Sequence, residues 1–182
     1  DSLAINFEQG RLVHTGRPLD FALDGDNRFF SVETPEGPLY TRNGVFRTNT
    51  KGQIVDGAGR MVSGQNGPLV VPPSVSPSQL NVSKTGHISA NGISIGQFKI
   101  VEFEDAKKLR PAGGVAYTAP EGVEPENAKD PAVCQRFQEA SNVVAVEELV
   151  DLITLSRLYE SSFKSIGAQD DRMKSILQVA MG

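Results

Sequence analysis

The stretch RFFSVETPEGPLYTR, residues 28–42, decides the fold class that this sequence predicts. Residues 28–33 are rich in aromatic and β-branched side chains, which favour strands. Residues 35–37 (Pro-Glu-Gly) supply turn chemistry, and a second apolar run follows at residues 39–42. Two such runs joined by a tight turn predict an antiparallel β-hairpin.

The same pattern continues over residues 19–103. Further short strands are predicted at residues 45–48, 53–55, 61–62 and 80–82, with the longest strand at 95–103. Turn signals separate them at residues 51–52, 56–57, 84–86 and 90–92. The sequence therefore predicts a mainly β fold over residues 1–140, an irregular domain of short antiparallel strands and hairpins.

Three segments are predicted to interrupt the strands. Residues 72–77 contain three prolines and are expected to form an extended connector. Asp105 is expected to cap a brief helix that runs through Leu109 and stops before Pro111. Residues 111–131 contain four of the other eight prolines and are predicted to be an irregular loop.

Residues 141–182 are predicted to form a long C-terminal amphipathic α-helix. Ser141 or Asn142 supplies the N-cap, and Glu147 and Glu148 lie near the positive end of the helix dipole. Apolar side chains recur at helical spacing at Leu149, Leu152, Ile153, Leu155, Tyr159, Phe163, Ile166, Met173, Leu177 and Ala180. A helix of this length is a rod of roughly 55 Å, longer than the preceding domain covers. We expect the seam to pack against other subunits; the alternative is that the helix folds back as ordinary core.

Composition and charge exclude several function classes. The formal net charge is −4 and no cluster of Lys and Arg is present, so we expect no nucleic-acid partner. No apolar run approaches the length that a membrane span needs. Residues 1–4 show no cleavable signal peptide, and because the sequence has no initiator methionine we expect it to begin inside a longer natural chain.

Catalytic chemistry has little support in the sequence. His14 and His87 show no local triad or metal-ligand spacing, and the single cysteine, Cys134, has the character of a small apolar residue. We expect no enzyme activity, catalytic residue, cofactor, metal or small-molecule substrate. A Ser–His–Asp arrangement assembled only in space, as in a hydrolase, stays open as an alternative, as does a secreted β-rich binding module on a helical stalk.

Several motifs resemble those of bacterial flagellar rod and hook proteins. Residues 9–20 (QGRLVHTGRPLD) resemble the signature QG-x-L-x-x-TG-x-PLD, and residues 40–46 (YTRNGVF) resemble YTRNG-x-F. Residues 139–143 (EASNV) resemble the segment E-x-SNV that begins the family's terminal helix. The motif residues are Gln9, Gly10, Leu12, Thr15, Gly16, Pro18, Leu19, Tyr40, Thr41, Arg42, Asn43, Gly44 and Phe46.

The resemblance implies a structural subunit of the flagellar basal-body rod, the periplasmic shaft that transmits torque for motility. A short middle section and residues 92–103 are most similar to a proximal rod subunit; a distal rod or hook subunit is the alternative. The implied partners are further copies of the chain, other rod and hook subunits, and the type III flagellar export apparatus, without membrane insertion. The predicted subunit interface comprises Ser141, Asn142, Val143, Leu149, Ile153, Tyr159, Phe163, Ile166, Met173 and Leu177.

The chain departs from the family pattern at three places. The turn at residues 25–30 (GDNRFF) lacks the second glycine of G-x-GFF, and Asn27 is expected to adopt the left-handed conformation in its place. Val144 and Ala145 replace the family's second Asn. The family's N-terminal helix, which the resemblance pairs with the C-terminal one, is not in this sequence, so the seam lacks its natural partner if the chain was truncated.

Overall fold

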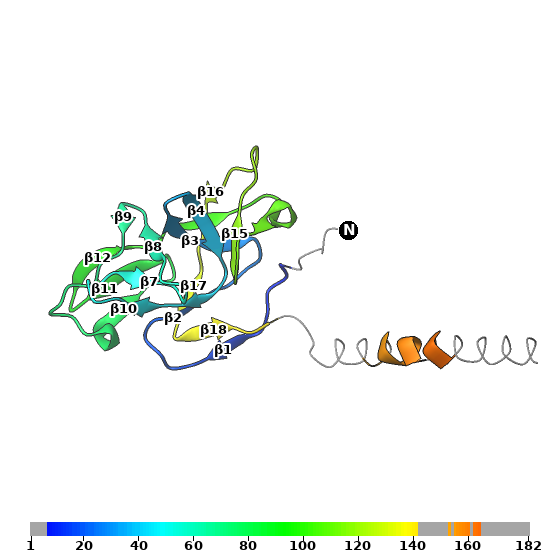
Figure 1. Cartoon of the computed structure of the whole chain (residues 1–182). Coiled ribbons are helices and arrows are strands. Elements are labelled where there is room, and N and C mark those ends of the chain that lie inside the picture. The colour runs from blue at the N-terminus through cyan, green and yellow to red at the C-terminus, as the bar shows by residue number, and fades with distance from the viewer. Residues whose placement is uncertain (1–6, 142–152, 154, 161, 165–182) are drawn as a thin grey trace, which may run out of the picture. The chain divides into compact units, whose positions relative to one another are not determined.

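The computed structural model describes residues 7–141, 153, 155–160 and 162–164 (Figure 1). The chain divides into two compact units, Asp1–Asn142 and Val143–Gly182. The described residues of the first unit form a β domain of short strands, and those of the second are helical. The mainly β fold with short antiparallel strands is therefore confirmed.

The main sheet of the β domain is assembled around the predicted hairpin. Its strands are β3 (Arg28–Thr34), β4 (Gly37–Thr41), β6 (Arg47–Thr48), β7 (Ile54–Val55), β8 (Met61–Gly64), β9 (Gly67–Pro68), β13 (Ile100–Glu102), β14 (Arg110–Pro111), β15 (Ala116–Thr118) and β16 (Glu126–Asn127). The order is β14-β15-β4-β3-β8-β7-β6, with β13 also on β3, β16 on β13 and β9 on β8. Thr34 pairs with Gly37, so a two-residue turn closes the β3–β4 hairpin.

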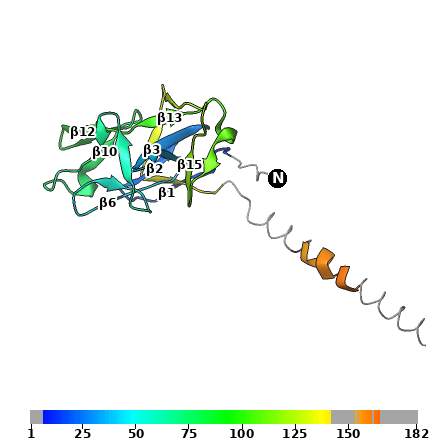
Figure 2. The same ribbon diagram turned by 45° about the horizontal axis from the view of Figure 1, so that its top comes forward.

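Three smaller sheets complete the domain. The first has the order β17-β2-β5, formed by Val133–Gln135, Asp20–Leu23 and Gly44–Val45; the second is β10-β11-β12, formed by Leu80–Val82, His87–Ala90 and Ile93–Gln97; the third pairs β1 (Leu12–His14) with β18 (Phe137–Glu139). Two 3₁₀ helices, η1 (Pro77–Gln79) and η2 (Ala106–Lys108), connect strands. Both views place β10 and β12 at one end of the domain and β15 at the other (Figure 1, Figure 2).

Strand β3 separates two hydrophobic clusters. Successive side chains of a strand point to opposite faces, so Phe29 and Phe30 enter different clusters, and both are fully buried. Phe30 packs edge-on against Phe46, with ring centroids 5.2 Å apart. On the other face Phe29 packs against Phe103 at 5.6 Å, and Tyr40 lies in the same cluster. The core therefore covers both sides of the central strand, and the motif residues Tyr40 and Phe46 are buried in it.

Three sequence predictions of secondary structure are wrong. Residues 95–103 are not one strand, because the chain changes partners at Phe98 and Lys99: their backbone amides donate to the carbonyls of Gly86 and Ser63, each at 2.9 Å. The predicted loop at residues 111–131 contains β15, β16 and the end of β14. A tight turn closes the β14–β15 hairpin, since Gly113 and Gly114 have φ angles of +97° and +61°. The predicted strand at 45–48 is also interrupted, at Phe46, whose amide donates to Leu19.

Two local predictions are confirmed. Asn27 has a φ of 59°, so it replaces the missing glycine in a left-handed conformation. Asp105 caps η2, and its carboxylate accepts a hydrogen bond from the Lys107 amide at 3.2 Å. Both depend on short-range chemistry that a few neighbouring residues determine.

Strands β17 and β18 form one extended run with a left-handed break at Arg136. Arg136 has a φ of 67°, its amide donates to the carbonyl of Asp20 at 2.7 Å, and its carbonyl accepts from the amide of Thr15 at 2.8 Å. On one side of this break β17 pairs with β2, and on the other side β18 pairs with β1. The single left-handed residue lets the chain change sheets.

We expect Arg136→Val to lower the free energy of unfolding by about 2–3 kcal/mol, because a β-branched residue is strained in this conformation. Arg136→Gly should change it by less than about 1 kcal/mol, because the relief of strain and the greater entropy of the unfolded chain oppose each other. Urea unfolding of both variants, followed by circular dichroism, checks this expectation. Equal midpoints for the two variants would contradict a requirement for the left-handed conformation.

The described residues of the second unit, 153, 155–160 and 162–164, are helical. Leu155, Tyr159 and Phe163 follow one another at four-residue spacing and are 55%, 64% and 67% exposed. The rings of Tyr159 and Phe163 are 6.2 Å apart. Within the described part of the chain, no helix has the length and apolar character needed to cross a bilayer.

Much of the predicted interface falls on residues whose structure is not described. The residues concerned are Asn142, Val143, Leu149, Ile166, Met173 and Leu177. Ser141 lies at the exposed end of the β domain, and Ile153 is helical and 54% exposed. The full length of the predicted helix therefore remains a prediction.

Candidate functional site

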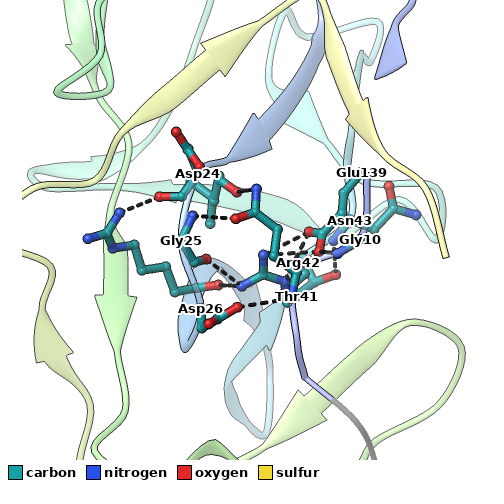
Figure 3. Close-up of polar contacts among 11 residues, drawn as sticks. Gly10, Asp24, Gly25, Asp26, Thr41, Arg42, Asn43 and Glu139 are labelled. Carbon is teal, nitrogen blue, oxygen red and sulfur yellow. Dashed lines mark hydrogen bonds and ion pairs between the residues drawn. The ribbon is translucent and has the colours of Figure 1, made fainter. Parts of the chain in front are cut away.

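Residues from three distant motif stretches meet where the chain enters and leaves the β domain (Figure 3). Strands β1 and β18 are antiparallel, with Leu12 opposite Glu139 and His14 opposite Phe137. The amide of Gly10 donates to the Glu139 carboxylate at 2.9 Å, and the amide of Ala140 donates to the carbonyl of Arg11 at 2.9 Å. We call the group Gln9, Gly10, Gly25, Arg42 and Glu139 the polar junction.

Arg42 and Glu139 form the centre of the polar junction. Arg42 Nε lies 3.0 Å from Glu139 Oε2, and Nη2 lies 3.1 Å from Oε1 and 2.9 Å from Oε2. Both side chains are largely buried, with 11% and 13% exposed. The two parallel contacts form the fork geometry that arginine makes with carboxylates, which is stronger than a single ion pair in water.

The third guanidinium nitrogen of Arg42 binds the main chain. Arg42 Nη1 donates to the carbonyls of Gly25 and Arg28 at 3.1 and 3.2 Å. The guanidinium carbon also lies 6.0 Å from the centre of the Phe29 ring, at the limit of a cation–π contact. One side chain thus joins β18 to the start of β3.

Gln9 secures the turn that precedes β3. Its side-chain oxygen accepts from the backbone amide of Gly25 at 2.9 Å, and its backbone amide donates to the Asp26 carboxylate at 2.9 Å. The side chain of Arg28 donates to the carbonyl of Asp24 across the same turn. The two bonds of Gln9 join the QG motif to the altered glycine turn.

The motif segment after β4 forms a tight turn. Asn43 accepts from the amide of Val45 at 3.0 Å, and Thr41 accepts from the amide of Asn43 at 3.1 Å while donating to the carbonyl of Val115 at 2.8 Å. Gly44 then pairs with Phe21 of β2, and a Cβ there would collide with the Phe21 carbonyl. A residue without a side chain is needed for this approach.

The other motif residues hold β1 and β2 in place. Thr15 and Gly16 donate their amides to the carbonyl of Arg136, Gly16 has a φ of +74°, and Leu19 is buried in the core. Gln135, which sequence reasoning missed, donates to the carbonyls of Pro18 and Leu80, each at 2.9 Å. A glutamine within an apolar strand was the only sequence signal for it.

The geometry gives no support for catalysis. The His14 ring packs on Phe137, with centroids 5.0 Å apart, and the amide of His87 donates to the Ser83 hydroxyl at 3.2 Å. Burial raises the pKa of the Cys134 thiol, as does the nearby Asp24 carboxylate, while Lys84 lowers it. A raised pKa disfavours the reactive thiolate. Among the described residues, no three His, Cys, Asp or Glu side chains lie together as a metal site.

Comparisons with known proteins agree with the motifs. The family "Flagellar hook protein FlgE/F/G D1 domain" matches residues 22–90, and "Flagellar basal body rod FlgEFG protein C-terminal" matches residues 135–179. The chain is 32% identical to the flagellar basal-body rod protein FlgF of Caulobacter vibrioides, over 97% of this chain and 71% of that protein. It is 33% identical to FlgG of Agrobacterium fabrum, over 93% of this chain and 67% of that protein, and 30% identical to FlgG of Bacillus subtilis.

A β domain tied together at its two chain ends, with an exposed apolar helical segment and matches of this extent, defines a structural assembly protein. The chain belongs to the family of flagellar basal-body rod proteins. It is a structural subunit of the rod and not an enzyme. The function that the motif resemblance implies is therefore confirmed, and the hydrolase and binding-module alternatives are rejected.

Proposed function

We propose that this chain is a proximal rod subunit that polymerises through its C-terminal helix into the shaft crossing the periplasm. The observation that carries the proposal is the exposed apolar stripe of Leu155, Tyr159 and Phe163. Helices with such a stripe bury it against neighbours, and head-to-tail contacts that do not close on themselves produce helical filaments.

The two parts of the chain have different roles in the proposed subunit. Residues 1–140 supply a stiff β domain, and residues 141–182 supply a long assembly helix whose seam includes the predicted interface residues. The partners are further copies of the chain and other rod subunits, after delivery by the flagellar export apparatus without a cleaved signal peptide.

The polar junction supports pairing of the terminal helices. Because Gly10 lies beside Glu139, a segment that precedes β1 and the segment that follows β18 begin side by side. Two helices that begin side by side can pack along their seams as a coiled coil. This geometry fits the N-terminal helix that the family resemblance implies.

The proximal position rests on the similarity of residues 92–103 and the short middle section to proximal subunits. A distal rod or hook subunit of the same family is the second candidate, because one matching family model is named for a hook protein and the other for basal-body rod proteins.

Electron microscopy of basal bodies from cells lacking the gene tests the proposal. We expect basal bodies without a complete rod, hook or filament, and the level at which the rod stops separates a proximal from a distal subunit. Complementation with the gene should restore complete structures. Intact rods, hooks and filaments in the deletion strain, in the absence of a paralogue, would contradict the proposal.

A further inference from the structure

The β1–β18 pair is the link between the terminal segments and the rest of the β domain. Each of its strands has three residues, and it forms a two-stranded sheet of its own. Val13, in the middle of β1, is 39% exposed. A two-stranded ribbon of this size is at best marginally stable in water, so it needs an anchor on the larger sheets.

Arg42 anchors the Glu139 end of the ribbon from outside, whereas the hydrogen bonds of Arg136 to Asp20 and Thr15 hold its other end. Arg42 follows β4 of the main sheet, yet its guanidinium group binds the carboxylate of Glu139 in β18, 97 residues later in the sequence. The same carboxylate accepts a hydrogen bond from the backbone amide of Gly10. Glu139 of β18 is therefore bound both to Arg42 and to the segment that precedes β1 (Figure 3). Nη1 completes the link by binding the carbonyls of Gly25 and Arg28 ahead of and within β3.

We infer that Arg42 is the positioning residue that locks both terminal segments to the β domain, so that force entering through those segments reaches the domain through a rigid connection. The inference rests on the proposed rod function, since a subunit that transmits torque requires this stiffness. It assigns the YTRNG motif a mechanical role at the junction in addition to the local turn at Asn43 and Gly44.

The chemistry requires arginine at this position. The planar guanidinium group binds a carboxylate with two nitrogens and two carbonyls with the third, whereas a lysine ammonium is a compact point charge. Loss of either partner leaves the other charge largely buried without its counter-ion, which is unfavourable. The link therefore either forms completely or opens.

A second ion pair in the domain serves as a matched control. Arg60 Nε lies 2.7 Å from Asp56 Oδ2, with both side chains similarly buried, at 18% and 7% exposed. This pair is four residues apart within the loop between β7 and β8, and the carboxylate of Asp56 also accepts from the amides of Ala58 and Arg60 in that loop. Arg60→Gln removes a comparable ion pair without releasing the ribbon.

Hydrogen exchange of the full-length chain tests the lock directly. In Arg42→Gln we expect the amides of Gly10 and Ala140 to exchange at least about tenfold faster, while those of β3 and β4 keep their protection, because only the Glu139 end of the ribbon opens. Arg60→Gln should leave the ribbon amides unchanged. Should Arg42→Gln not fold, Arg42→Lys retains the charge and should give a smaller increase at the same amides. Uniform acceleration over the whole domain, or no change in the ribbon, would overturn the inference.

A charge swap tests whether the link requires the geometry of arginine at position 42 or only the attraction between two opposite charges. In Arg42→Glu with Glu139→Arg, the new carboxylate would face the carbonyls of Gly25 and Arg28, and the new guanidinium would face the donor of Gly10. The ribbon amides of this double variant should therefore exchange as fast as those of Arg42→Gln. Restored protection would show that charge attraction alone is sufficient and would refute the specific role of arginine.

Motility under load tests the consequence in cells. Arg42→Gln should swim close to wild type in dilute medium and lose at least half of its relative speed in viscous medium, whereas Arg60→Gln should not. Equal speeds of the two variants in viscous medium would overturn the mechanical role. If the wild-type gene itself fails to restore rods to a deletion strain, the proposed rod function fails instead, and the exchange result still decides whether Arg42 locks the ribbon.

Discussion

Replacing Tyr159 and Phe163 together by Ser is expected to abolish rod assembly while the β domain stays folded. Both side chains are exposed in the isolated chain, at 64% and 67%, so their truncation removes little that stabilises it. If they are buried between subunits, each truncation removes about 2–5 kcal/mol of packing. Two such losses weaken a subunit contact by roughly a thousandfold or more, since 1.4 kcal/mol corresponds to a factor of ten.

The matched control for this pair is Arg157→Ser with Lys164→Ser. These positions lie on the other side of the same helical segment, away from the stripe of Leu155, Tyr159 and Phe163, and they receive the same new side chains. Rods counted by electron microscopy and swarm diameter measure assembly, and circular dichroism checks the fold. Normal rods in Tyr159→Ser with Phe163→Ser, or equal loss in the control, would remove this stripe from the interface.

Local chemistry made part of the fold predictable from the sequence. The β3–β4 hairpin needs only two apolar runs and a turn between them, and the left-handed Asn27 needs only its place in a glycine turn. The cap at Asp105 likewise depends on the residues that directly follow it. Each of these features is determined within about ten residues of chain.

The remaining features depend on partners that sequence spacing does not reveal. The predicted strand at residues 95–103 is interrupted at Phe98 and Lys99, because their amides donate to the carbonyls of Gly86 and Ser63. The motifs marked Arg42 as a family residue but gave no sign that its partner is Glu139. The pairing follows from the left-handed turn at Arg136, which directs β18 onto β1. Long-range contacts of this kind require the fold before they can be seen.

The helix seam illustrates the same limit. At four-residue spacing, Leu155, Tyr159 and Phe163 share a face, whereas Ile153 lies one turn before Arg157 on the other side of the helix. A seam drawn from apolar spacing alone joins both faces. We therefore expect Tyr159 and Phe163 to contribute more to assembly than Ile153.

Gly44→Ala is expected to lower the free energy of unfolding of the β domain by about 3 kcal/mol, at the upper end of what overpacking costs. A Cβ at this position would overlap the backbone carbonyl of Phe21 and come within 3.0 Å of the Phe30 ring. The carbonyl cannot rotate away as a flexible side chain can, because β2 is held between β5 and β17. Relief requires β2 and β5 to separate, which opens the core beside Phe30. Urea unfolding of the full-length chain, followed by circular dichroism, measures the loss.

Gly57→Ala is the control that makes the result specific. No atom lies within 4 Å of a Cβ at Gly57, and its φ is outside the left-handed region, so Ala fits there without strain. Removing a glycine from an unstrained site should stabilise the domain by about 0.4–1 kcal/mol, because it reduces the entropy of the unfolded chain. The two substitutions are chemically identical but should shift the midpoint in opposite directions. If both raise it, the contact between β2 and β5 is looser than the structure shows, and the glycine of the YTRNG motif is then required by assembly and not by the fold of the domain.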